Sequence, residues 1–176
     1  MLFIPPYWSH RVTALDLSIS VNVFSDTAEL INFYNIQQIP LDFFKQYSKS
    51  GDEAVYAAKS YFHQIAEGLM PPERVAKYWS QVYESRYGPL EPLLANATSI
   101  DFSNFCNAKK VRPKPAVQSA VRQPAKNVAA LFKQMPKDID VISLANYVEE
   151  IGRVIFGPEN VGAFIKHCLV SSASTH

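Results

Sequence analysis

The sequence is poor in the residues that build disulfide frameworks and metal centres. Its 176 residues include two cysteines, six glycines and four histidines. Cys106 and Cys168 have no metal-ligand spacing and cannot form a framework, so we expect two packed thiols in a reducing compartment. No hydrophobic run approaches the roughly 18 residues that span a bilayer, and the N-terminus lacks the basic region of a signal peptide. These absences predict a soluble protein of the cytoplasm or nucleus without a membrane partner.

An excess of charge of either sign is also missing. Seventeen Lys and Arg balance sixteen Asp and Glu, which leaves a net charge of +1. Global electrostatics therefore argue against nucleic acid as a partner. The 48% of hydrophobic residues is ordinary for a globular chain and is enough for one domain, or for one domain with an extension.

The common catalytic signatures are absent as well. The chain has no G-x-x-x-x-G-K-[ST] loop, no G-x-G-x-x-G, no H-E-x-x-H and no G-x-S-x-G. This excludes the usual phosphate-loop, dinucleotide-binding, zinc-protease and serine-hydrolase motifs.

The N-terminal residues have the pattern of strands. From Leu17 to Phe24 apolar and polar residues alternate, and the apolar positions are rich in β-branched side chains. The stretch from Ser9 to Ala14 is a second candidate strand, joined to the first by a turn short enough for an antiparallel hairpin.

Helical patterns follow. A capping box of Ser50 and Glu53 precedes apolar residues at helical spacing, and a second such segment completes a predicted helical hairpin at about 52–87. Helical spacing returns within 127–170, and the tail 171–176 is expected to be disordered. Residues 109–126 carry six basic residues, three prolines and no acid, which is typical of an exposed linker.

The opening I-P-P-Y-W-S-H, followed by a hairpin and S-I-S-V-N-V-F, resembles the C-terminal end of a JmjC or cupin-like (cupin 8) domain. The resemblance covers residues 1–36 and is to protein hydroxylases of the factor-inhibiting-HIF type. It implies an α+β fold, mostly helical in this chain: a terminal β-hairpin of a double-stranded β-helix (jelly roll), then about four to five α-helices. The expected units are 1–36 (β-helix strands), 37–105 (helical extension), 106–126 (basic linker) and 127–170 (C-terminal helices).

The resemblance also implies an oxygenase that uses Fe(II) and 2-oxoglutarate. His10 corresponds to the last member of the 2-His-1-carboxylate triad, which leaves positions on iron for the 2-oxo acid and dioxygen. Ser20 and Asn22 correspond to positions that line the 2-oxoglutarate pocket.

The sequence departs from the family pattern at the other two ligands. None of the four histidines, at positions 10, 63, 167 and 176, begins an H-x-D/E element. His63 and His167 are interpreted as structural or surface residues. One ligand of three gives poor metal affinity, so we expect this chain alone to bind no cofactor, to contain no catalytic residue and to be inactive. We interpret it as the C-terminal remnant of a longer oxygenase, so its own status as an enzyme stays open.

Three functions remain open. In the first, the parent enzyme hydroxylates or demethylates a protein substrate. In the second, the chain is a non-catalytic module that forms a homodimer through its C-terminal helices, in the ranges 52–87 and 140–169. The favoured alternative for these amphipathic faces is that they pack on each other and on the barrel. In the third and least favoured, the basic linker contacts nucleic acid.

Overall fold

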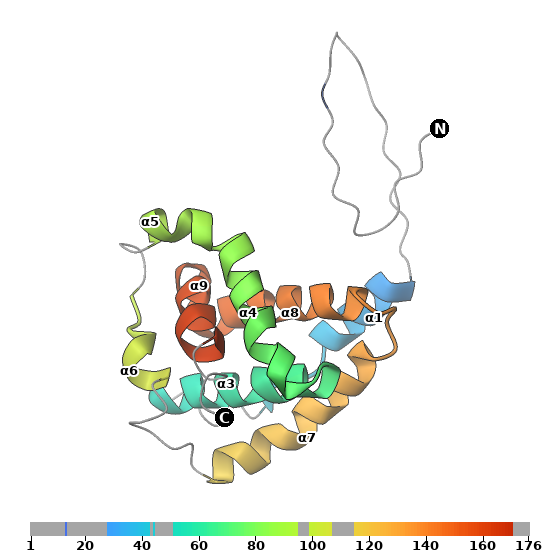
Figure 1. Cartoon of the computed structure of the whole chain (residues 1–176). Helices are drawn as coiled ribbons and strands as arrows, with labels where there is room; N and C mark the ends of the chain where they lie inside the picture. The colour runs from blue at the N-terminus through green and yellow to red at the C-terminus, as the bar shows by residue number, and fades with distance from the viewer. Residues whose placement is uncertain are drawn as a thin grey trace.

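The structure is a computed structural model of the chain, and it describes residues 13, 28–42, 44, 51–94, 99–106 and 115–170. These residues form helices around a single core (Figure 1). The longer helices are α1 (Ala28–Gln37), α3 (Gly51–Leu69), α4 (Pro72–Arg86), α7 (Pro115–Phe132) and α8 (Ile139–Phe156).

Shorter helical segments connect the longer ones and finish the chain. They are η1 (Gly88–Leu90), α5 (Glu91–Leu94), α6 (Phe102–Cys106), η2 (Pro158–Asn160), α9 (Val161–Phe164) and η3 (Ile165–Val170), which is a π-helix. Helices α3, α4 and α8 lie where the sequence predicts helices, because apolar side chains recur on one face of each and are buried there.

The α+β fold class expected from the sequence is wrong. The described residues form helices and contain no strand, and α1 begins inside the segment 1–36 that was assigned to strands of a β-helix. In α1, Ile36 is buried and Phe33 packs against the core, whereas Ile31 and Tyr34 are exposed. Burial at a spacing of three residues is helical and not the alternation of a strand. The predicted hairpin from Ser9 to Phe24 lies outside the described residues, Thr13 excepted.

The segment expected to be a basic linker also differs from the prediction. Residues 115–126 form the first two thirds of α7, with Pro115 at its first position and Pro124 in its interior. Pro115 suits the start of a helix because its missing N–H would have no partner there. Pro124 removes one backbone hydrogen bond, and the helix nevertheless continues because its apolar face, which includes Val121 and Val128, is buried.

Helix α7 packs most extensively on α3. The two helices approach closely at Gly68, where a Cβ atom would lie 2.8 Å from the Cβ of Ala129. The core between these helices, α8 and the C-terminal segment contains many aromatic side chains. Its largest fully buried side chains include Trp79, Tyr61, Tyr147, Phe62, Phe102, Phe132 and Phe164.

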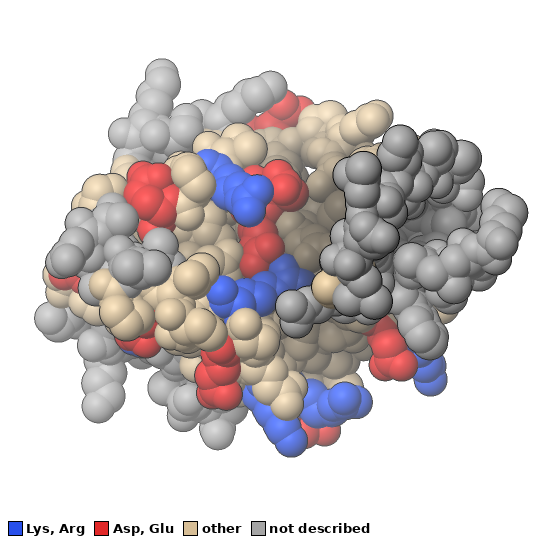
Figure 2. All heavy atoms as spheres, turned by 90° about the horizontal axis from the view of Figure 1, so that it is seen from above, with Lys and Arg blue, Asp and Glu red and all other residues tan. Residues whose placement is uncertain are grey.

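The C-terminal segment lies between two other parts of the chain. In Figure 1, α9 lies between α4 and α5 on one side and α6 on the other, and η3 contacts both α4 and α6. On the face of the molecule that Figure 2 shows, acidic and basic side chains are intermixed. None of the helices that the structure describes combines the length and the apolar character needed to cross a bilayer.

Candidate functional site

The site residues predicted from the sequence all belong to the N-terminal segment 1–36. His10, Ser20 and Asn22 lie outside the described residues, so the structure gives no geometry for the proposed iron and 2-oxoglutarate site. In the part of the chain that is described, no group of three or more His, Cys, Asp or Glu residues could hold a metal ion. His63, on α3, lies with its Nε2 3.3 Å from Oε1 of Glu67 one turn later.

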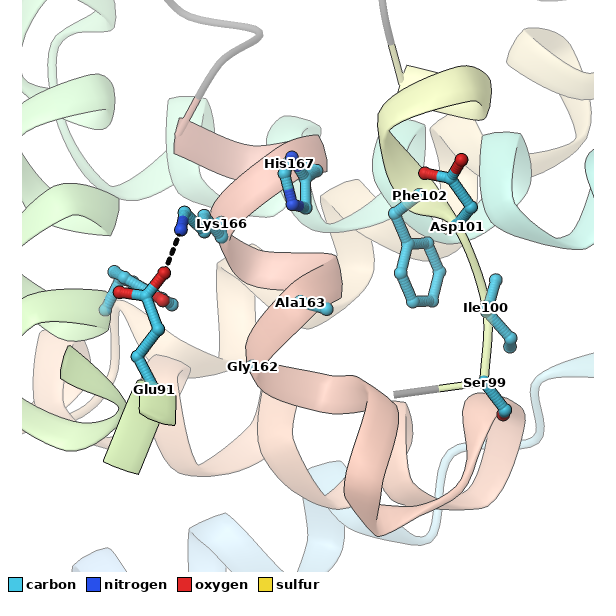
Figure 3. Close-up of a pocket in the computed structure, with 10 residues that line it drawn as sticks. Glu91, Ser99, Ile100, Asp101, Phe102, Gly162, Ala163, Lys166 and His167 are labelled. Carbon is cyan, nitrogen blue, oxygen red and sulfur yellow. Dashed lines mark hydrogen bonds and ion pairs between the residues drawn. The ribbon is translucent and has the colours of Figure 1, made fainter. Parts of the chain in front are cut away.

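A cleft of about 410 Å³, lined by both charged and apolar residues, lies at the C-terminal segment (Figure 3). One wall carries Tyr83 and Glu91, and the opposite wall is the stretch 99–102 that leads into α6. Lys166 and His167, on η3, lie between these walls. The charged residues of the cleft therefore come from three distant parts of the sequence, which is why no local motif predicts it.

Lys166 and Glu91 form an ion pair at one side of the cleft (Figure 3). Their hydrogen bond and opposite charges raise the pKa of Lys166 and lower the pKa of Glu91. The ammonium group also lies 5.5 Å from the centre of the Tyr83 ring, within range of a cation–π interaction. Both charged side chains are exposed, so the pair adds little to stability.

The carboxylate of Asp101, on the opposite wall, accepts hydrogen bonds from residues at the start of α6. Its Oδ1 accepts a hydrogen bond from the backbone N–H of Ser103 at 3.1 Å, and its Oδ2 accepts one from the Asn104 amide at 2.6 Å. The hydrogen bond from the Ser103 hydroxyl is the largest cause of the lowered pKa of Asp101. This carboxylate therefore stabilises the exposed N–H groups at the helix start, as N-terminal capping residues do.

The buried side chain of Asn160 holds in place the stretch 99–102, which forms one wall of the cleft. Its Oδ1 accepts hydrogen bonds from the backbone N–H groups of Ser99, at 3.0 Å, and Ile100, at 3.2 Å. Its Nδ2 donates to the carbonyl oxygen of Phe156 at 2.7 Å. Asn160 thus fixes the end of α8 to the stretch 99–102.

A disulfide between Cys106 and Cys168 joins α6 to η3 next to the cleft. The expectation of two separate thiols is therefore wrong. The cysteines are 62 residues apart in sequence, but the fold brings their Cα atoms to 4.9 Å, within the range that a disulfide bridges. Both are buried, and Lys59 donates a hydrogen bond to the Cys106 carbonyl at 3.2 Å.

His167, on η3, is a histidine of the cleft whose pKa is shifted by its surroundings. Partial burial, and then the positive charge of Lys166, lower its pKa, while Asp101 and Glu91 act in the opposite direction. The imidazole is therefore neutral at pH 7. Among the described residues, the Ser99 hydroxyl bonds to Asn160 and not to His167, so the cleft contains no serine activated by a base.

A second hollow, of about 460 Å³, is apolar. Helices α3 and α8 and the end of α6 contribute Val55, Val154, Ile155 and Phe105 to it, together with Phe44. The Val154 side chain is 84% exposed, the most exposed large apolar side chain that the structure describes. The sequence analysis missed Val154, because a single apolar residue outside the amphipathic pattern of a helix gives no signal before the neighbouring helices are known.

The resemblance of residues 1–36 to the JmjC class stays a prediction. In comparisons with known proteins, no family model, no curated protein and no solved structure matches the chain.

Proposed function

We propose that this chain is the helical, non-catalytic part of an oxygenase of the JmjC class that uses Fe(II) and 2-oxoglutarate. The observation that carries the proposal is the order and spacing of I-P-P-Y-W-S-H and S-I-S-V-N-V-F, which places His10 where that class has an iron ligand. The absence of an H-x-D/E element from the sequence favours a non-catalytic role for the chain itself. One imidazole cannot provide the three protein ligands of the facial triad.

The residues that the structure describes do not fit an iron site, so no step of oxygen chemistry is assigned to them. In the proposal, the remaining ligands and the contacts to a protein substrate belong to the rest of the oxygenase. The proposed location is the cytoplasm or nucleus, where glutathione keeps most thiols reduced. There the bond between Cys106 and Cys168 would depend on the redox state of the cell.

The apolar hollow favours a second role for the same helices, the formation of a homodimer. Its walls come mainly from α3 and α8, inside the ranges 52–87 and 140–169 that the sequence analysis considered as a dimer interface. The exposed Val154 at this hollow is the kind of apolar side chain that a second copy of the chain can cover.

Production of succinate from 2-oxoglutarate tests the oxygenase proposal. The native transcript is sequenced upstream of the Met1 codon, and its longest in-frame product is purified beside this chain. With Fe(II), we expect succinate from the longer product and none from this chain. In the longer product, His10→Ala should abolish succinate formation, and the control His63→Gln, on α3, should not. An upstream region without H-x-D/E, or activity unaffected by His10→Ala, would overturn the proposal.

Analytical ultracentrifugation tests the homodimer. The chain should sediment as a dimer, and Val154→Glu should make it a monomer because a carboxylate would have to be buried. The matched control is Ile142→Glu, which changes an exposed apolar residue of the same helix away from the hollow. A monomeric parent chain, or equal effects of the two substitutions, would contradict the proposed dimer.

A further inference from the structure

The near-neutral net charge conceals a strong separation of charge along the sequence. Of the seventeen Lys and Arg residues, eight lie in residues 109–137, which contain no Asp or Glu. The other nine share the rest of the chain with all sixteen acidic residues. Residues 109–137 therefore carry eight positive charges and the remainder carries a net charge of −7. A local field of this kind attracts polyanions whatever the total charge.

Four of these eight basic residues lie in the part of the chain that the structure describes, two of them inside the segment 106–126 that was expected to be a linker. Arg122 and Lys126 lie on α7, and Lys133 and Lys137 follow its end; all four side chains are exposed. We call these four residues the basic face. The N–H of Lys133 still donates to the carbonyl of Ala129, so the helical path continues to Lys133.

The helical positions of the basic face lie on one side of α7. At 100° per residue, Arg122, Lys126 and Lys133 fall within about 40° of one another, and they span about 16 Å along the axis. Among the described residues no ion pair involves any of the four side chains. Their charges are consequently available to a partner.

The other exposed side chains of α7 indicate the kind of partner. Gln118, Ser119, Gln123 and Asn127 are exposed and can donate hydrogen bonds to phosphate oxygens, as such side chains do on nucleic acids. The large apolar side chains that the structure shows exposed lie on other elements, at positions 31, 34, 90, 142 and 154. A protein partner usually requires an apolar or aromatic anchor, and single-stranded nucleic acid requires aromatic stacking platforms. The exposed residues of α7 offer neither.

We propose that the basic face binds the phosphate backbone of double-stranded nucleic acid, without reading its sequence. The proposal is independent of the proposed oxygenase, since it uses none of that site's residues. Helix α7 packs against α3, and this packing fixes the helix that carries the basic side chains. Ordering of the helix before binding lowers the entropic cost of the contact.

Fluorescence anisotropy with the full chain tests the proposal. The probes are a duplex DNA of about two helical turns and a duplex RNA of the same length. Three phosphate contacts, from Arg122, Lys126 and Lys133, predict that log K falls with log salt with a slope of about −2.7 for B-DNA. The RNA duplex distinguishes general recognition of a duplex backbone from a preference for one helix form, and binding of either duplex with this salt dependence supports the proposal.

A pair of matched variants connects the binding to α7. Arg122→Gln/Lys126→Gln should reduce the slope by about 2 and weaken binding by at least about tenfold at low salt. Arg74→Gln/Lys77→Gln removes one Arg and one Lys from exposed positions of α4, which makes it a control for net charge, and should change binding much less. Circular dichroism verifies that both variants fold.

Three outcomes would overturn the proposal. The first is no binding of either duplex by the full chain. The second is an equal loss in the two variants, which would assign the effect to net charge. The third is competition by poly-glutamate as effective as that by duplex, which would assign the basic face to an acidic protein.

Discussion

Asn160 is one of two polar residues, with Ser143, that the structure describes as buried. Replacing Asn160 with Ala would leave the N–H groups of Ser99 and Ile100 and the carbonyl of Phe156 without this partner. Because an unpaired buried polar group costs about 1–3 kcal/mol, we expect the free energy of unfolding to fall by about that amount. Urea denaturation measures it.

Two further variants separate the hydrogen bonds of Asn160 from its volume. Asn160→Asp keeps an acceptor for the two N–H groups and should lose less stability than Asn160→Ala. Asn127→Ala removes an exposed amide of α7, which bonds to Gln123, and should change the free energy of unfolding by less than about 0.5 kcal/mol. Equal losses for Asn160→Ala and Asn127→Ala would show that the hydrogen bonds of Asn160 to the stretch 99–102 do not stabilise the fold.

Gly162 lies directly against an aromatic ring. A Cβ atom at this position would lie 2.6 Å from Cδ1 of Tyr87, and the Tyr87 hydroxyl is itself bound to Glu149 at 3.0 Å. The ring cannot move without loss of that bond, so Gly162→Ala should lower the free energy of unfolding by about 1–3 kcal/mol. Gly152→Ala is the control for helix propensity, because its nearest contacts, to Val161 methyl groups, are at 3.4 Å. Equal melting temperatures for the two variants would contradict this clash.

The disulfide stabilises the packing of two helical segments, because it joins α6 to η3 beside the cleft. The chain-entropy model gives about 4 kcal/mol for closure of a loop of this length, an upper value when the unfolded chain retains structure. Reduction with a dithiol should therefore lower the free energy of unfolding by about 2–4 kcal/mol. Denaturation with and without reductant measures the difference.

The matched control for reduction is Cys106→Ser/Cys168→Ser. This variant should be less stable than the oxidised protein and insensitive to reductant. If the parent protein were equally insensitive and contained two free thiols under oxidising conditions, the disulfide would be refuted.

The sequence predicts some helices over their whole length and others only in part, for physical reasons. Helices α3 and α8 bury residues at regular helical spacing, so their pattern is local. In α7, Pro124 locally disfavours a helix, and burial of the apolar face against α3 decides the outcome instead. Tertiary contacts of this kind are invisible in one segment of sequence.

The same distinction explains what could be foreseen of the cleft. Glu91, Asp101 and Lys166 come from three separated segments, and neither their proximity nor the disulfide follows from local spacing. The one family-like motif of the sequence, around His10, falls outside the described residues. Local pattern was therefore informative about individual helices and uninformative about the site that their packing creates.

Across the whole fold, buried tyrosines make stability depend on alkaline pH. The hydroxyl groups of Tyr61 and Tyr147 are 2.8 Å apart in the core. Burial raises the pKa of both, that of Tyr147 to about 12, and burial also raises the pKa of Tyr78. The folded protein therefore retains these protons at a pH at which the unfolded chain, with a tyrosine pKa of about 10, releases them.

The sign of the effect follows from these protonation states. Below about pH 10 both states are protonated and this contribution to stability is fully present; above it the unfolded state binds fewer protons, so stability falls by about 1.4 kcal/mol per pH unit for each such tyrosine. Urea denaturation between about pH 9 and about pH 11 measures the slope. Tyr61→Phe/Tyr147→Phe removes both hydroxyl groups of the pair together. It should reduce the loss of unfolding free energy per pH unit by up to the contribution of two tyrosines, about 2.8 kcal/mol. If the double variant kept the slope of the parent protein, the alkaline loss of stability would come from groups other than this pair.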